Sequence, residues 1–164
     1  PPPRSTQGVS AAASDVYKRQ EVDVHEVHHD SGGSGALMIA AARGFASSHD
    51  GVEWRFYNEG LHAHYLRAVT TTSRSTFVCA SRGPRGQETA IYRRATGSET
   101  PFSRCEYEGG WLSKNVDAAA LTATGNEVLF GTGDGYVHRS EDDGQTWACC
   151  AADLPAVKTV LITH

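Results

Sequence analysis

Eight residues near the C-terminus, Ser140 to Trp147, constrain the fold of this chain more than any other segment. They read S-E-D-D-G-Q-T-W and directly follow an alternating apolar stretch. Ser and Asp side chains can bond backbone amides a residue or two ahead, which fixes a tight turn. Gly144 supplies a positive φ, and Trp147 begins a strand with a large apolar face. The pattern predicts a β-hairpin whose turn is held by Ser140 and Asp142.

A second copy of the pattern lies upstream, in S-S-H-D-G-V-E-W. It keeps Ser47, Gly51 and Trp54 at the same offsets, while His49 stands where the pattern has Asp. We therefore expect this second hairpin to be held less firmly. Between the two copies, residues 94–102 occupy the expected place but have lost the pattern, and Phe102 could replace the Trp only with a shifted turn.

Both copies resemble the Asp-box, the hairpin signature of BNR-repeat and sialidase-like β-propellers. In that family the boxes lie on the periphery of the blades and have a structural role. The resemblance therefore implies a repeating all-β fold, related in architecture to WD40 and YVTN propellers. It does not by itself imply an activity, because one fold supports many functions.

The spacing of the apolar runs indicates an internal repeat of propeller-blade length. Each box, or its expected place, follows two short apolar runs, and aligning Phe45, Tyr92 and Val137 gives spacings of 47 and 45 residues. Units of about 40–50 residues with several short strands are typical of propeller blades. Residues 36–42 could begin a helix, but flanking glycines and the repeat register favour a strand.

The predicted fold is all-β: a partial β-propeller of three four-stranded antiparallel blades. We place the blades at roughly 21–61, 62–112 and 113–155. Their first strands are expected at Val22–Val27, Leu66–Thr71 and Val116–Leu121. Residues 156–164 are predicted to form the first strand of a fourth blade. Propellers commonly need at least four blades to close a ring, so we expect the chain to be a fragment whose partners include the remaining blades.

Residues 1–20 fit no part of the repeat. The segment D-V-Y-K-R-Q at 15–20 resembles a translated sequencing-library adapter, and residues 10–14 resemble the upstream part of that adapter. We interpret 1–20 as a disordered or artefactual tail and exclude it from fold reasoning.

Composition excludes several classes of function. The net charge is −4, and it becomes −6 when the three basic residues and one acidic residue of 1–20 are set aside. This acidity argues against a nucleic-acid-binding surface. No apolar run approaches the ~20 residues of a membrane-spanning helix. The four cysteines form no C-x-x-C pair, so we expect free, mostly buried thiols, which favours a reducing compartment such as the cytoplasm.

Two segments carry side chains that could bind ligands. On a strand, His25 and His29 share one face, so a metal site there would need a partner such as His62 or His64 from another blade. A polar channel-facing or edge strand is the favoured interpretation, and we predict no metal or other cofactor. The glycine-rich segment 131–135 lacks the helix that a phosphate-binding loop needs, and is predicted to be a turn between strands.

The leading functional hypothesis is a binding or scaffold module for a protein or carbohydrate ligand. The resemblance to WD40-like scaffolds and to photosystem-assembly-type Asp-box proteins implies such a role. The alternative is part of a glycoside hydrolase, of the exo-sialidase or xyloglucanase type. Sialidases use an arginine cluster, a Tyr–Glu pair and an Asp acid/base. Arg43, Arg67, Tyr65 and Asp23 are of suitable types, but nothing in their sequence context singles them out, so we assign no catalytic residue.

Overall fold

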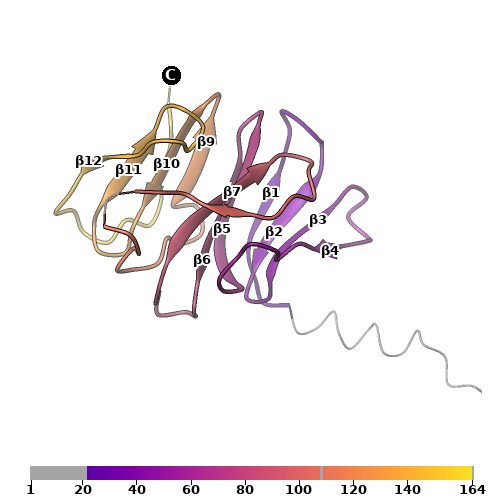
Figure 1. Cartoon of the computed structure of the whole chain (residues 1–164), viewed down its shortest axis with the longest axis horizontal. Coiled ribbons are helices and arrows are strands. Elements are labelled where there is room, and N and C mark those ends of the chain that lie inside the picture. Colours follow the sequence, from indigo (N-terminus) through magenta and orange to yellow (C-terminus); the bar gives the residue numbers. More distant parts are fainter. Residues whose placement is uncertain (1–21, 108, 164) are drawn as a thin grey trace, which may run out of the picture.

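The computed structural model describes residues 22–107 and 109–163. The adapter-like segment and the tail therefore lie outside the described residues. Within those residues, all regular structure is β, in three separate four-stranded sheets (Figure 1). No helix forms over residues 36–42, which belong to a strand and the turn that follows it.

Each sheet is an antiparallel meander in which neighbouring strands along the chain pair with one another. The first sheet contains β1 (Val24–His29), β2 (Leu37–Ala41), β3 (Gly44–Ser48) and β4 (Arg55–Phe56). The second contains β5 (Tyr65–Thr71), β6 (Ser75–Ser81), β7 (Ala90–Ala95) and β8 (Ser103–Arg104). The third contains β9 (Leu121–Thr124), β10 (Glu127–Gly131), β11 (Val137–Ser140) and β12 (Ala148–Ala151).

The three sheets stand side by side, with the second between the first and the third (Figure 1). Their first strands are neighbours, because β5 contacts both β1 and β9. This is the arrangement of successive propeller blades, in which first strands lie innermost.

Successive side chains of β6 point to opposite faces of the second sheet and contribute to both interfaces between sheets. On β6, Val78 and Ala80 pack toward the first sheet, whereas Phe77 and Cys79 pack toward the third. The second sheet is consequently covered on both faces, which explains why every residue of β6 is buried. A strand buried on both faces no longer reads as apolar–polar alternation, although its side chains still alternate between two cores.

Two predicted strands need correction. The first strand of the third sheet begins at Leu121, not at Val116, because residues 117–119 form a turn in which the Ala120 amide bonds the Asp117 carbonyl at 3.0 Å. Val116 is fully buried in the interface with the second sheet, so its apolar character reflects packing of the preceding loop.

Residues 156–163 form no strand. They dock against the third sheet through backbone bonds from Val157 to Thr132 and from Val160 to Ala119. The side chain of Val157 lies directly against Gly131, where there is no room for a Cβ atom. An apolar alternating pattern therefore marks a docked extended segment here, without the ladder of a fourth sheet.

The cysteines divide into two pairs. The buried thiols, Cys79 and Cys105, lie in the interface between the second and third sheets. The β12 thiols, Cys149 and Cys150, are exposed because β12 is the outer edge of its sheet. The expectation of mostly buried thiols is therefore right for only one pair. The described residues also contain no apolar helix of membrane-spanning length.

Candidate functional site

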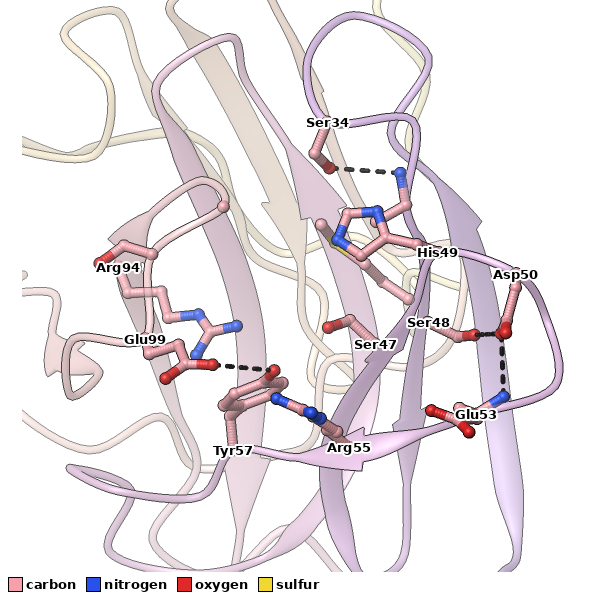
Figure 2. A pocket seen from close by; sticks show the side chains of 14 residues that line it. Ser34, Ser47, Ser48, His49, Asp50, Glu53, Arg55, Tyr57, Arg94 and Glu99 are labelled. Carbon is pink, nitrogen blue, oxygen red and sulfur yellow. Dashed lines mark hydrogen bonds between the residues drawn. The ribbon is translucent and has the colours of Figure 1, made fainter.

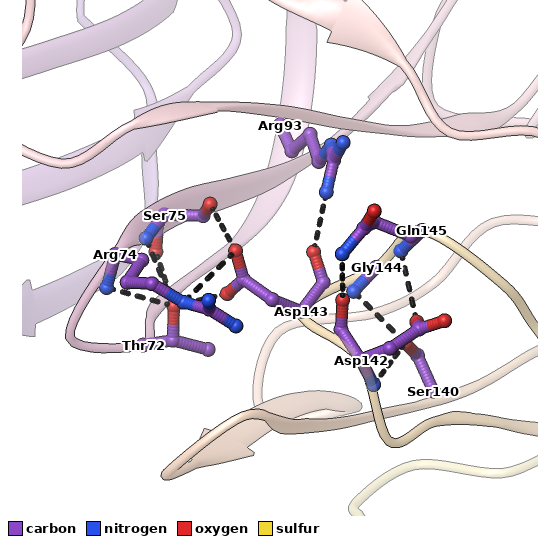
Figure 3. Close-up of polar contacts among 9 residues, drawn as sticks. All are labelled: Thr72, Arg74, Ser75, Arg93, Ser140, Asp142, Asp143, Gly144 and Gln145. Atoms are coloured by element: carbon purple, nitrogen blue, oxygen red, sulfur yellow. Dashed lines mark hydrogen bonds and ion pairs between the residues drawn. The ribbon is translucent and has the colours of Figure 1, made fainter.

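The turn between β11 and β12 is held by its own side chains (Figure 3). The Ser140 hydroxyl donates to Asp142 at 2.9 Å and accepts the Gly144 amide at 2.8 Å. Asp142 Oδ1 also accepts the amides of Gln145 and Thr146, at 3.0 and 2.8 Å. The indole of Trp147 donates to the Gly144 carbonyl at 3.1 Å, and its ring packs against the core of the third sheet. These bonds form a closed local circuit.

The corresponding turn after β3 contains the same circuit, shifted by one residue from the predicted alignment. Ser48, not Ser47, donates to the carboxylate and accepts the Gly51 amide, at 3.0 and 2.9 Å. Asp50, not His49, is that carboxylate, and it accepts the amides of residues 52 and 53. Trp54 bonds the Gly51 carbonyl as its counterpart does in the third sheet. The turn is one residue shorter between Ser and Gly, which an alignment without gaps cannot represent.

Asp143 joins the third sheet to the second (Figure 3). Its carboxylate is buried and accepts hydrogen bonds from the hydroxyls of Thr72 and Ser75, at 2.6 and 2.7 Å. Its backbone carbonyl accepts a bond of 2.7 Å from Arg93. Asp143 also has a positive φ of 62°, which Asp tolerates better than most residues. The hairpin turn therefore also serves as a clamp between sheets.

A second clamp lies at the inner edge, where the first strands meet. The two carboxylate oxygens of Glu26 accept the backbone amides of Val69, at 2.7 Å, and Ala119, at 3.0 Å. One side chain of the first sheet thus bonds a strand of the second sheet and the turn that precedes the third sheet. Burial raises the pKa of Glu26, although these two amides oppose the shift. The amide of Val69 belongs to the free edge of β5, so Glu26 satisfies a donor that no strand pairs.

Asp117 lies in the turn that contains the Ala119 amide. It accepts Arg67 at 2.6 Å on one oxygen and Lys158 at 2.7 Å on the other. Partial burial alone would raise the pKa of Asp117, but the bonds from Lys158 and Arg67 hold it below its usual range. The inner edge therefore contains two carboxylates whose pKa values are displaced in opposite directions.

The residue types considered for sialidase chemistry do not all meet. The Tyr65 ring lies 4.8 Å from that of His25, and the Arg67 guanidinium lies 5.8 Å from the Tyr65 ring centroid. A carboxylate oxygen of Asp23 lies 3.3 Å from the Nε2 atom of His25. Arg43 is elsewhere, in a groove on the outer face of the first sheet. Three of the four groups are thus gathered at the inner edge, without the arginine cluster of a sialidase.

The histidines of β1 have other partners. His25 Nδ1 lies 2.5 Å from the Leu66 carbonyl, and His28 Nε2 lies 2.8 Å from the Thr71 hydroxyl. A bulge between Val24 and Glu26 interrupts the alternation on which the shared face of His25 and His29 was predicted. Within the described ranges, no group of three or more His, Cys, Asp or Glu side chains is placed to hold a metal ion.

An open pocket of about 400 Å³ separates the first two sheets at their outer ends (Figure 2). At its base, the Arg94 guanidinium lies 4.7 Å from the ring centroids of Phe45, Tyr57 and Phe102. Arg94 is only 8% exposed, and its Nε atom has no hydrogen-bond partner. Burial lowers the pKa of Arg94, opposed by the nearby Tyr57 and Glu99.

Sequence reasoning did not identify this pocket. In the sequence, Arg94 stands out only as the first residue of the segment 94–102 that has lost the box pattern, whereas the strand alternation of β7 directs its side chain into the aromatic cage. The sequence feature that could have indicated the pocket is the loss of the box pattern in this segment, because residues 97–99 line the pocket.

Comparison with protein-family models and with characterised protein sequences finds no match. Solved structures do match. The chain is 16% identical to the GH74 xyloglucanase from Xanthomonas campestris, with a TM-score of 0.59 over 77% of this chain and 20% of that one. It is 18% identical to YCF48 from Cyanidioschyzon merolae, with a TM-score of 0.56 over 79% and 37%. For YCF48 bound to D1 peptide, the values are 14%, 0.57, 81% and 42%.

These similarities concern the fold alone. The chain spans about a fifth of the GH74 enzyme and about two fifths of YCF48. Three four-stranded antiparallel sheets with adjacent first strands match the blades of these proteins. The chain is a partial β-propeller.

Proposed function

We propose that this chain is part of an Asp-box β-propeller that acts as a binding module, with its ligand site in the pocket between the first two sheets. The observation that carries the proposal is Arg94, a buried cation beside an open pocket that forms no salt bridge with any described residue, although Glu99 borders the same pocket. Burying an unpaired charge is costly, and aromatic rings offset only part of that cost. A ligand with an acidic group would supply the missing partner.

The positions of the carboxylates also favour binding over catalysis. Both oxygens of Glu26 and both oxygens of Asp143 accept bonds that tie neighbouring sheets together. Asp142 is occupied in the same way within its own turn. Carboxylates whose oxygens already accept these bonds are poorly placed to transfer protons. The same bonds make the scaffold rigid, as a binding surface requires.

One observation favours the alternative, a glycoside hydrolase fragment. Glycosidases use two carboxyl groups whose pKa values are pushed apart, one kept protonated and the other ionised. The pKa of Glu26 is raised and the pKa of Asp117 is lowered, so the two are displaced in these directions at the inner edge. The bonds that occupy all four oxygens argue against it.

We further propose that additional blades cover the outer face of the first sheet. This face presents an apolar groove in which Val27 is 64% exposed, Val52 62% and Phe56 43%. The opposite face of the same sheet is packed against the second sheet. The matched propellers are longer than this chain, which supports further blades as the occupant.

Two measurements on the full chain test the binding assignment. The first follows hydrolysis of xyloglucan and of a fluorogenic sialoside, where we expect no turnover. Turnover that Glu26→Gln or Asp117→Asn abolishes would establish the hydrolase alternative. The second applies the chain to an array of neutral and acidic glycans and peptides, where we expect retention of an acidic class. Retention of none would refute the binding module.

A further inference from the structure

The charge and geometry of Arg94 determine which ligand group the pocket can bind. Arg94 takes part in none of the ion pairs among the described residues, and its Nε–H is buried without an acceptor, so a ligand in the pocket can reach only the rest of the guanidinium. Glu99 is close, but its Oε1 atom accepts the Tyr57 hydroxyl at 3.4 Å. A guanidinium stacked on aromatic rings still presents its N–H edge, and that edge matches a planar carboxylate.

The rest of the lining limits the ligand to one acidic group. Arg55 adds a second cation, but Glu53 and Glu99 border the same space (Figure 2). A ligand with several negative charges, such as an acidic peptide, would meet repulsion from these carboxylates. A ligand with one carboxylate would meet less repulsion, provided that its remaining groups donate hydrogen bonds to Glu53 and Glu99.

Hydroxyl groups on the ligand can donate these hydrogen bonds. Glu53 and Glu99 offer acceptor oxygens, the Ser47 hydroxyl can donate or accept, and the Tyr57 hydroxyl, which donates to Glu99, can still accept. Acidic and hydroxyl side chains beside an aromatic ring suit a compact polyol. The volume of about 400 Å³ lies at the lower end of the range for small-molecule sites.

We propose that the pocket binds a monosaccharide-sized hydroxylated carboxylate, of the uronic-acid type. Its carboxylate lies on the edge of Arg94 that lines the pocket, and its hydroxyls bond the carboxylates and hydroxyls of the rim. The inference rests on the proposed binding function and narrows it to a ligand class. The site lies between two sheets at their outer ends, away from the inner edge where Glu26 and Asp117 lie.

The test is an NMR titration of the ¹⁵N-labelled full chain with D-glucuronate, D-glucose and acetate. We expect D-glucuronate to bind at least tenfold more tightly than either of the others, because only it offers both kinds of group. Arg94→Met should weaken D-glucuronate at least tenfold, as expected for loss of a charge-assisted hydrogen bond. The matched control is Arg85→Met, at an exposed arginine outside the pocket, which should leave binding unchanged.

A second variant protects the test from a folding defect. Arg55→Gln changes an exposed side chain on the rim and should weaken D-glucuronate by about threefold or more, within the range of a solvent-exposed ion pair. The inference is overturned if acetate or D-glucose equals D-glucuronate, or if neither variant changes its affinity. Retention of an acidic peptide on the array without D-glucuronate binding would leave the binding module intact and refute only this ligand class.

Discussion

Replacing Asp143 tests whether the hairpin turn clamps two sheets together. In Asp143→Ala, the hydroxyls of Thr72 and Ser75 lose a buried acceptor that they contact at 2.6 and 2.7 Å. Hydrogen bonds to a charged group contribute about 1.5–3 kcal/mol each, and Thr72 retains part of its bonding through the Ser75 carbonyl. Ala is also less tolerant than Asp of a positive φ, which adds about 1 kcal/mol. We expect a total loss of about 3–4 kcal/mol.

Asp143→Asn separates these effects, because Asn tolerates the backbone conformation and keeps one acceptor oxygen. It should cost about 1–2 kcal/mol. Urea unfolding followed by tryptophan fluorescence measures both values, since Trp147 lies in the same hairpin. Equal m-values are needed to interpret the midpoints as stability.

A double-mutant cycle with Ser75→Ala provides the decisive control. Because the two side chains are in contact, their coupling free energy should be about 1–2 kcal/mol. Strictly additive effects, or a loss below about 0.5 kcal/mol for Asp143→Ala, would refute the clamp.

Three other perturbations follow from the same structure. Asp142→Ala should cost about 1 kcal/mol, as for loss of a comparable helix cap, while Glu141→Ala on the exposed rim of the turn serves as its control in the same urea assay. Bonds led by the Thr146 hydroxyl lower the pKa of Asp142 to about 2, so this contribution is present above about pH 4 and is lost as the pH falls toward 2. Acid titration of stability should therefore be shallower in Asp142→Ala. The β12 thiols should react with a chromogenic disulfide in the folded chain, whereas burial, which raises the pKa of each of the buried thiols to about 12, should delay their reaction until unfolding. Finally, the apolar groove should promote self-association of the chain, and Val27→Lys or Phe56→Lys should reduce the mass measured by light scattering. An unchanged mass would argue that the groove contributes nothing.

Local patterns predicted the repeat because each blade must satisfy the same constraints. The predicted first strand of the second sheet, Leu66–Thr71, differs from β5 by one residue, and the aligned residues Phe45, Tyr92 and Val137 each lie in the third strand of a sheet. The sequence alone did not show which residue of a turn forms its hydrogen bonds. Ser47 and Ser48 are equivalent in type, and only the hydrogen bonds show that Ser48 holds the turn.

Local sequence patterns could not predict the contacts between sheets. Glu26 reaches Val69 and Ala119, which are 43 and 93 positions away, and no local pattern encodes such a bridge. The apolar segment at 156–163 illustrates the converse. Its alternation satisfies the period of a strand, but strand formation needs a partner edge, and in this structure the segment finds backbone bonds only to a turn and a loop.

The break in the repeat and the pocket around Arg94 have one physical origin. In the first and third sheets, the turn after the third strand is closed on itself by a serine, an aspartate and an indole. Among the described residues, no such circuit follows β7 in the second sheet, and the ring centroid of Phe102 lies 5.5 Å from that of Phe45. Glu99, which follows β7, therefore lines the same pocket as Arg94, which the alternation of β7 directs toward the neighbouring sheet. Natural proteins depart from local consistency chiefly where function requires it, so the one degenerate turn among three is the position where a repeat protein would acquire a site.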